Sequence, residues 1–332
     1  MKKVTMLDIA KQAGVSKATV SMVLNKRDES ISDETKNKIL NLAKELNYIP
    51  NSLARGLSTK KTRTIGIVLP DITNPFFSSI ARAIEDSASS SGYNVIFCNT
   101  DNEMGKEQEY IKLLISKLVD GVIFATGGES CSSVNMLKHN SVPFVLVDRY
   151  IDGYEKEYGV YSLNQEGVME GIDYLHSIGS RKIAFVKGNE NLQISNERLK
   201  GYKKAMDKYC IYDKNLIFSG DFTIEGGINA TKQILDHIGN IDAIFYSNDM
   251  MALGGMKVLL RNGLKIPEDV KIMGFDNIDI CEIFEPELTT IAQPIYDMGK
   301  EACNLLIDII DNKDIEKKQV YFKTSLVIRK TT

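Results

Sequence analysis

Apolar residues near the start of the chain recur at the spacing of short amphipathic helices. The first stripe consists of Met6, Ile9, Ala10 and Ala13. Gly14 follows as a residue that can end a helix in a tight turn, and Ser16 is a favourable N-cap for a second helix. The inward face of that helix carries Val20, Val23 and Leu24, which leaves Lys17, Ala18, Ser21 and Met22 on the outward face.

A third helix is predicted after Ser32, its N-cap, with Asp33 and Glu34 near the positive end of the helix dipole. Its buried stripe is Ile39, Leu42, Ala43 and Leu46, and Pro50 ends it. Two short helices that meet at a glycine-containing turn and are completed by a third predict a helix-turn-helix unit. A structural module of three helices that tethers a larger body fits the same spacing.

From residue 64 onward, short β-rich runs alternate with amphipathic helices. A helical stripe such as Ile111, Leu114, Ile115 and Leu118 lies between two of these runs. The alternation predicts an α/β fold with two doubly wound, mostly parallel sheets side by side. The runs predicted as buried strands are 64–69, 94–97, 122–124, 142–147, 182–186, 243–246 and 270–275.

The composition fits a globular protein of two or three domains, since 43% of the 332 residues are apolar and 26% are charged. No apolar run approaches the ~20 residues that span a bilayer, and the start turns acidic at Asp8 before a signal-like segment forms. We therefore expect a cytoplasmic protein. The five cysteines are scattered without a Cys-x-x-Cys pair, so reduced thiols, no metal site and no cofactor are expected.

Charge is distributed unevenly along the chain. Residues 1–63 hold 13 Lys or Arg against 6 Asp or Glu, a net charge of +7, whereas the remainder holds 28 against 38, a net charge of −10. A basic head of this kind favours a polyanion through counterion release, although a solvated basic surface is also compatible with it.

The residues of this head resemble the headpiece of LacI/GalR-family transcription regulators. The resemblance rests on residues 4–10, 13–21 and 47–51. It implies that residues 16–25 form a recognition helix, with Lys17, Ala18 and Met22 toward base edges and Ser16, Ser21 and Asn25 toward phosphates. Thr5 would also lie near the DNA backbone. The thioether of Met22 cannot make the paired hydrogen bonds of an arginine to guanine, so only apolar contact is expected there.

Residues 51–63 form a polar, basic linker, and its first seven residues, 51–57 with Gly56, are too few to hold a helix alone. The resemblance implies that two such segments, one per subunit, become helical together in the minor groove of DNA. In that arrangement Asn51 and Arg55 contact DNA and Leu57 wedges into a base step. A flexible tether whose leucines touch the body is the alternative.

Polar and aromatic residues follow the predicted strands, where open α/β sheets bind ligands. Carboxylates, amides and guanidinium groups beside aromatic rings suit a sugar, because the charged groups hydrogen-bond hydroxyls and the rings stack on C–H faces. Asp and Asn at strand ends are also ordinary helix caps, and Phe76 and Phe77 also fit a core. The candidate ligand-binding residues are Asn74, Phe76, Phe77, Asp148, Arg149, Arg198, Phe222, Asn248, Asp276 and Gln293.

Residues 60–332 resemble the periplasmic sugar-binding-protein fold that the same regulator family carries. The resemblance places these ten residues in a pocket like that of the ribose-type binding proteins. The segment 192–194 lacks the polar groups of nucleobase-binding relatives, which argues against a purine effector. Ribose or a similar monosaccharide is the expected effector.

The sequence thus predicts a homodimeric DNA-binding repressor of carbohydrate-utilisation genes, switched by a sugar. The expected domains are residues 1–50 (headpiece), 51–63 (hinge) and 64–332 (effector binding and dimerisation), the last dividing into 64–161 plus 292–320 and 162–291 plus 321–332. A regulator controlled mainly by a protein partner and a sugar-binding protein without DNA function are the alternatives. An enzyme is disfavoured because no nucleophile elbow, phosphate-binding loop or dinucleotide fingerprint is present.

Overall fold

The computed structural model describes residues 4–25, 28, 30–49, 61–126, 131–151, 153–154, 156–236 and 241–332. The chain divides into two compact units, Met1–Thr62 and Arg63–Thr332, and each is described by itself. The predicted hinge residues Asn51, Arg55 and Leu57 lie outside the described residues.

The first unit is a three-helix headpiece, and the predicted stripes form its core. Ile9, Val20 and Ile39, one from each helix, are fully buried together. Gly14 ends the first helix in the left-handed conformation, at φ 71°, as the tight turn requires. The helices are α1 (Met6–Ala13), α2 (Lys17–Leu24) and α3 (Asp33–Glu45).

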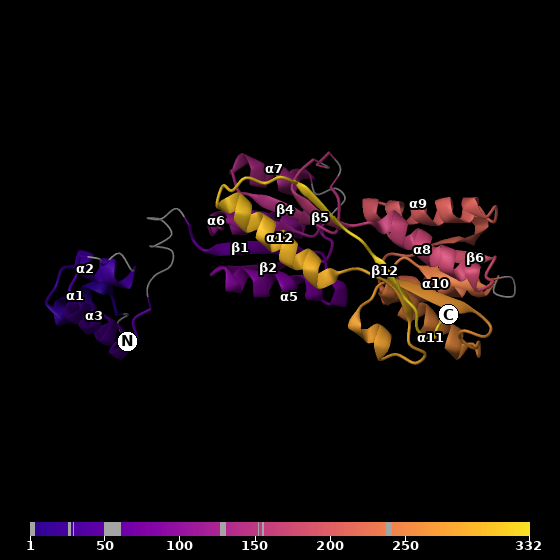
Figure 1. Ribbon diagram of the computed structural model, residues 1–332, viewed down its shortest axis with the longest axis horizontal. Coiled ribbons are helices and arrows are strands. Elements are labelled where there is room, and N and C mark those ends of the chain that lie inside the picture. Colours follow the sequence, from indigo (N-terminus) through magenta and orange to yellow (C-terminus); the bar gives the residue numbers. More distant parts are fainter. Residues whose placement is uncertain are drawn as a thin grey trace. The chain divides into compact units, whose positions relative to one another are not determined.

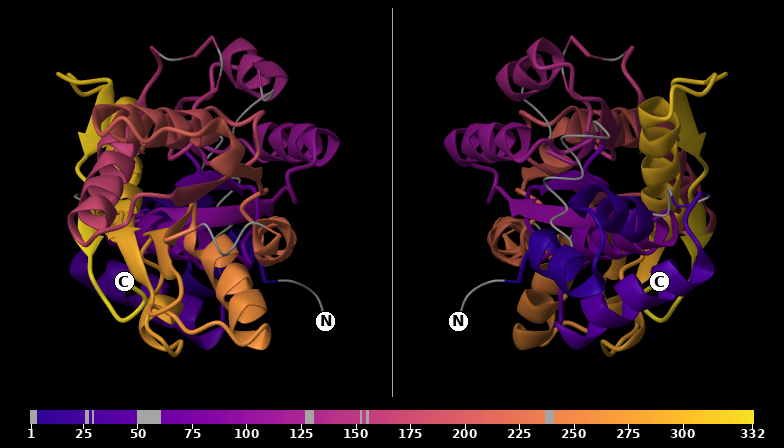
Figure 2. Two further views of the ribbon diagram at one scale, coloured as in Figure 1. Left: turned by 90° about the vertical axis from the view of Figure 1, so that its right-hand side faces the viewer. Right: turned by 90° about the vertical axis from the view of Figure 1, so that its left-hand side faces the viewer.

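Two six-stranded sheets form the second unit, and both have helices on either face (Figure 1, Figure 2). The first sheet has the order β11-β5-β4-β3-β1-β2, with all its strands parallel. Its strands are β1 (Thr64–Leu69), β2 (Asn94–Asn99), β3 (Gly121–Phe124), β4 (Phe144–Val147), β5 (Gly159–Ser162) and β11 (Gln319–Phe322). Its helices pack as two pairs, α5 (Pro75–Ser90) with α12 (Ile295–Ile310), and α6 (Met104–Ser116) with α7 (Cys131–His139).

The second sheet has the order β12-β10-β9-β8-β6-β7 and is parallel except for β12, which pairs antiparallel with β10. Its strands are β6 (Ile183–Lys187), β7 (Ile217–Ser219), β8 (Ala243–Tyr246), β9 (Lys271–Asp276), β10 (Thr289–Ala292) and β12 (Ser325–Val327). The paired helices are α8 (Asn164–Ser177) with α9 (Gln193–Lys208), and α10 (Ile224–Leu235) with α11 (Asp249–Arg261). The predicted α/β class with two wound sheets is confirmed.

The chain crosses between the two sheets three times in the described residues. It passes from β5 to α8, returns from β10 to α12, and crosses again from β11 to β12. Each crossing takes only a few residues, so the ends of the two sheets are held near one another while the sheets remain separate bodies.

One prediction about the helices of this unit is wrong in part. Ile111 and Leu114 are buried on α6, but the helix ends at Ser116. Leu118 then lies beyond the helix with φ 56° and is 53% exposed. The apolar spacing continues past the last helical turn, and the next residue, Val119, is buried instead of Leu118.

Candidate ligand and nucleic-acid sites

A cavity lies where the strand ends of the two sheets face each other. The first sheet contributes residues that follow β1 and β4, and the second contributes residues from α9 and from the ends of β7, β8 and β9. The described lining is Asn74, Phe76, Phe77, Asp148, Arg149, Ile194, Arg198, Phe222, Asn248 and Asp276.

On the side of the first sheet, Asn74 caps α5, and its side-chain oxygen accepts a hydrogen bond of 3.1 Å from the amide of Phe76. Asp148 follows β4 in the left-handed conformation, at φ 65°. Arg149 places its guanidinium 5.0 Å from the centroid of the Phe77 ring and donates to the side chain of Asn102 at 3.0 Å. The backbone turn after β4 therefore directs two opposite charges into one wall.

On the side of the second sheet, Asn248 caps α11 by accepting a hydrogen bond of 3.0 Å from the amide of Met251. Its amide nitrogen donates to the backbone oxygen of Phe222 at 3.0 Å. Asp276 ends β9 and accepts a hydrogen bond of 2.7 Å from the side chain of Gln293. The cap of α11 thus also positions an aromatic ring of the cavity wall.

Arg198 connects these groups from α9. Its Nε donates to Asn164 at 2.8 Å, and its terminal nitrogens reach the backbone oxygen of Ser247 and, at 3.4 Å, the carboxylate of Asp276. The guanidinium also lies over the ring of Phe275, 3.8 Å from its centroid. Only 3% of the Arg198 side chain is exposed, so its charge is held inside the protein by this network.

The charged groups of the wall are balanced, two carboxylates against two guanidinium groups. Burial raises the pKa of Asp148 to about 6, although Arg198 and Arg149 oppose the shift. Burial likewise raises the pKa of Asp276 well above its usual value against the effect of Arg198, and lowers the pKa of Arg149 to about 10. With both carboxylates ionised, the wall has no surplus of positive charge and favours a neutral polar ligand over an anion.

Two acceptors beside the network have no hydrogen-bond partner among the residues that the structure describes. They are the Oδ1 atom of Asp148 and the Oε1 atom of Gln293, and both are buried. Buried polar atoms in proteins are normally satisfied, and leaving one unpaired costs about 1–3 kcal/mol. The wall is therefore prepared to accept hydrogen bonds from a ligand's hydroxyl groups.

A third buried carboxylate, Asp249 at the start of α11, supports the wall from behind. It accepts hydrogen bonds from the Thr290 hydroxyl at 2.6 Å and from the Ile278 amide at 3.0 Å. Burial raises the pKa of Asp249 to about 6, and these hydrogen bonds oppose the shift. Asp249 joins α11, β10 and the loop after Asp276, so it helps to position Asp276.

Nine of the ten ligand-binding residues predicted from the sequence line this cavity, and Gln293 contacts it through Asp276. Their part in binding stays a prediction. Two contributors were missed. Ile194 precedes Arg198 by one helical turn, and that spacing could have found it. Asn164 comes from a distant segment, and no local signal marks it as the partner of Arg198.

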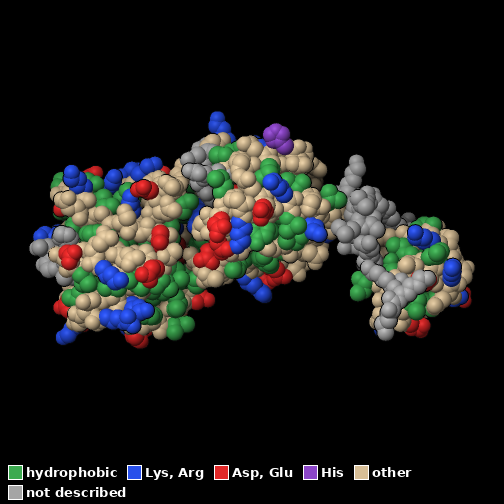
Figure 3. Space-filling view, turned by 180° about the vertical axis from the view of Figure 1, so that it is seen from behind, with side chains coloured by type: hydrophobic (Ala, Val, Ile, Leu, Met, Phe, Trp, Pro, Cys, Tyr) green, Lys and Arg blue, Asp and Glu red, His purple; other side chains and the backbone are tan. Residues whose placement is uncertain are grey.

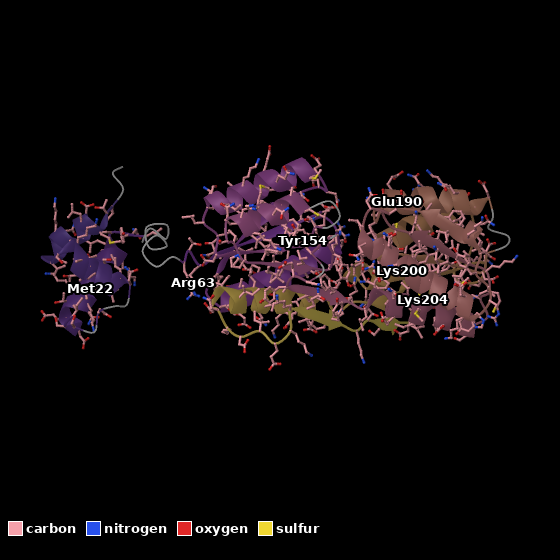
Figure 4. The ribbon with its side chains drawn as sticks, turned by 90° about the horizontal axis from the view of Figure 1, so that it is seen from above. Met22, Arg63, Tyr154, Glu190, Lys200 and Lys204 are labelled. Carbon is pink, nitrogen blue, oxygen red and sulfur yellow. The ribbon has the colours of Figure 1, made fainter. Side chains whose placement is uncertain are left out.

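In the headpiece, α2 presents a polar and partly apolar surface opposite its buried Val20 and Val23. Lys17, Ala18 and Met22 are exposed there, Met22 to 38%, and Met22 is labelled on this helix in Figure 4. These three residues lie where the sequence predicts contacts with base edges.

The side chains predicted to face phosphates are held by local hydrogen bonds. Ser16 accepts from the amide of Thr19 at 3.0 Å and so caps α2. Asn25 donates to the backbone oxygen of Ser21 at 2.7 Å and to its hydroxyl at 3.3 Å. Thr5 donates to Asp8 from both its backbone and its hydroxyl. These contacts fix the ends of the two helices, and DNA contact by these residues stays a prediction.

Three other features of the described residues bear on function: the surface charge, the capacity of the helices to span a membrane, and the grouping of metal-binding side chains. On the face of residues 63–332 seen in Figure 3, acidic and basic side chains are interspersed. None of the helices in the described part of the chain is both long and apolar enough to cross a membrane. Within the same residues, no group of His, Cys, Asp or Glu side chains is placed to hold a metal ion.

Comparison with known proteins covers both units. The family model of bacterial regulatory proteins of the lacI family matches residues 5–51, and that of periplasmic binding proteins and the sugar binding domain of the LacI family matches residues 62–329. A ribose operon repressor of Halalkalibacterium halodurans is 40% identical over 328 residues, which are 99% of this chain and 97% of the repressor.

Two solved structures share the fold. The lac repressor dimer bound to operator and the anti-inducer ONPF has a TM-score of 0.90 at 27% identity, covering 99% of each chain. A LacI family transcriptional regulator from Enterococcus faecium with bound ribose has a TM-score of 0.73 at 34% identity, covering 81% of this chain and 98% of the other. These matches confirm the resemblance predicted from the sequence.

Proposed function

Because the chain belongs to the LacI family of bacterial regulatory proteins, we propose that it is a DNA-binding repressor of carbohydrate-utilisation genes. Its operator affinity is switched by a monosaccharide, ribose or a similar aldose, bound in the cavity between the two sheets. The observation that carries the proposal is the buried, charge-balanced wall of Asp148, Arg149, Arg198 and Asp276 at this cavity. In this function the cavity binds its ligand without chemical conversion.

The wall suits a sugar in three ways. Asp148 offers an unpaired acceptor, and Arg149 and Arg198 offer donors, so adjacent hydroxyl groups can be bound in pairs. Phe76, Phe77 and Phe222 offer ring surfaces for the C–H face of the sugar. A phosphorylated sugar would bring a charge that the balanced wall does not neutralise. The ribose-bound relative supports a pentose.

The DNA-binding part of the proposal concerns the headpiece and the hinge. Residues 1–50 read the major groove through Lys17, Ala18 and Met22, residues 51–63 form the hinge, and residues 64–332 bind effector and dimerise. The protein works in the cytoplasm as a homodimer on a two-fold operator. The operator-bound dimer of the lac repressor supports this arrangement.

A sugar can switch DNA binding only if it prefers one arrangement of the two sheets. Asp148 and Arg149 come from the first sheet, and Arg198 and Asp276 from the second, so a ligand held by both binds best when these ends are close. Typical couplings of this kind are about 1–3 kcal/mol, a change of roughly 5- to 150-fold in operator affinity.

The test is isothermal titration of the full chain with a panel of pentoses and hexoses, followed by operator gel-shifts with and without the best sugar. We expect one aldose to bind and to change operator affinity, and Asp276→Ala to abolish its binding. Asp308→Ala, which removes a half-exposed surface carboxylate on α12, is the control and should bind as the parent does. The assignment of the cavity is wrong if Asp276→Ala binds the sugar normally. A sugar that binds but leaves DNA affinity unchanged would instead favour control by a protein partner.

A further inference from the structure

Gly188, the residue directly after β6, bears on the shape of the cavity although the described lining does not include it. We propose that Gly188 is a specificity-determining residue, because the space left by its missing side chain holds the ring of Phe222 and so sets the size of sugar that the cavity accepts. This inference rests on the proposed function and deepens it.

The contact between the two residues is unusually close. A Cβ atom added to Gly188 would lie 2.0 Å from Cζ of Phe222, and 2.2 and 2.5 Å from its two Cε atoms. Ordinary van der Waals contact begins at 3.4 Å, so the edge of the ring would have to retreat by about 1.4 Å. Any residue other than glycine at 188 therefore moves the ring.

The backbone of Phe222 is held in place, so the ring itself must turn. Phe222 has φ 71°, and its backbone oxygen accepts a hydrogen bond from Asn248, the cap of α11. The two chain neighbours of Phe222 are also joined to each other, because the carboxylate of Asp221 accepts hydrogen bonds from the amide and the hydroxyl of Thr223 at 2.9 and 2.7 Å. A shift of the main chain would break these contacts, whereas rotation of the ring breaks none of them.

Phe222 is half-buried: it packs against the hydrophobic core and also lines the cavity. We expect a ring displaced by a methyl group at 188 to move into the cavity and to approach Arg198, now 5.9 Å from the ring centroid. The cavity would become narrower beside a donor for sugar hydroxyls. A hexose, with one more carbon and hydroxyl than a pentose, should lose more affinity than the pentose.

The experiment is a double-mutant cycle in the full chain, with sugar affinity measured by calorimetry and stability by thermal denaturation. The variants are Gly188→Ala, Phe222→Ala and the pair. Gly105→Ala is the control, because a Cβ at that exposed glycine meets nothing within 4 Å. We expect Gly188→Ala to weaken pentose binding roughly 10-fold and hexose binding more, the scale on which a single methylene acts in a tight pocket. Gly105→Ala should change neither affinity.

The cycle separates a role through Phe222 from a general loss of structure. In the Phe222→Ala background, Gly188→Ala should no longer change affinity, the pentose-to-hexose ratio or the melting temperature. The inference is overturned if Gly188→Ala binds every sugar as the parent does, or if its effect persists without the ring. A parent chain that binds no sugar at all would overturn the proposed function, and the inference with it.

Discussion

Replacing Arg198 with methionine tests whether the buried charge network is built as the structure shows. The substitution keeps an unbranched apolar chain in place of the aliphatic part of arginine but removes the guanidinium. Asp276 then loses its cationic partner, and the side chain of Asn164 and the backbone oxygen of Ser247 lose a donor. The perturbation is therefore electrostatic more than steric.

The loss of stability caused by Arg198→Met depends on pH, and the direction of this dependence follows from the pKa values of the two carboxyls. Arg198 lowers the pKa of both Asp148 and Asp276 against the effect of burial, so its removal raises both further. A carboxyl whose pKa is higher in the folded state than its unfolded value of about 3.9 loses stability as pH rises through the folded value. The penalty of Arg198→Met must therefore grow from acid to alkaline pH.

The loss in the free energy of unfolding for Arg198→Met differs between two pH values. At pH 8, breaking a buried ion pair by removing one partner costs about 3–5 kcal/mol. At pH 5, the carboxyls of the variant can bind protons, and the remaining loss is that of the unpaired acceptors, about 1–3 kcal/mol. The difference between the two conditions is the signature of the network.

Urea denaturation of the parent and the variant at pH 5 and pH 8 measures both losses. Arg82→Met serves as the control, because Arg82 is 70% exposed and pairs with Asp86 on the surface of α5. Exposed pairs of this kind contribute about 0–1 kcal/mol, so this variant should resemble the parent at both pH values. An equal loss at pH 5 and pH 8 for Arg198→Met would refute the electrostatic account of the site.

Three further outcomes are expected. The affinity of the parent for its sugar should rise as pH increases through about 6, the pKa of Asp148. The reason is that sugar hydroxyls that donate to the carboxylate favour its ionised form. A sugar affinity that stays constant from about pH 5 to about pH 7.5 would exclude Asp148 from the site. Ser16→Ala removes the acceptor for the Thr19 amide and should destabilise α2 by about 1 kcal/mol. The loss should appear as faster hydrogen exchange of the α2 amides in the intact chain, and unchanged exchange would contradict the role of Ser16 as the N-cap. Asp249→Ala leaves the buried Thr290 hydroxyl and Ile278 amide without their acceptor and should lower the free energy of unfolding by about 1–3 kcal/mol, whereas a loss below 0.5 kcal/mol would mean that water replaces the carboxylate.

The elements that the sequence predicts best are those whose burial pattern is local. The stripes of the headpiece and the apolar runs of β1, β3, β4, β6 and β8 are decided by neighbours a few residues away. The strands that were missed, β5, β7, β10, β11 and β12, each include a Ser, Thr or Gln within three or four residues. Tyr321 of β11 is 47% exposed and Ser325 begins β12 with an exposed side chain, so pairing to distant strands, rather than hydrophobicity, makes these segments strands.

In the candidate site, too, residues with a local sequence signal were predictable and residues that matter through distant contacts were not. Asn74 and Asn248 were open to two interpretations, helix cap or cavity residue, and the structure shows both at once, since each caps a helix and lines the cavity. The position of such residues is predictable because strand ends of a parallel sheet share one edge. Asn164 and Gly188 were not predictable, because their importance lies in contacts with Arg198 and Phe222, which are distant in sequence.

The distribution of the site between the sheets decides which ligands can act as effectors. Asp148 and Arg149 follow β4 of the first sheet, while Arg198, Asn248 and Asp276 belong to the second, and short crossings of the chain join the two sheets. A compound that contacts residues of only one sheet has the same affinity in every arrangement of the two sheets. It therefore cannot shift the equilibrium between these arrangements, however tightly it binds. A sugar whose hydroxyls reach Asp148 and Asp276 together binds the closed arrangement better. Single-sided fragments such as a short diol should therefore occupy the cavity without altering operator affinity, and a diol that releases DNA as well as the full sugar would show that closure between the sheets is not the switch.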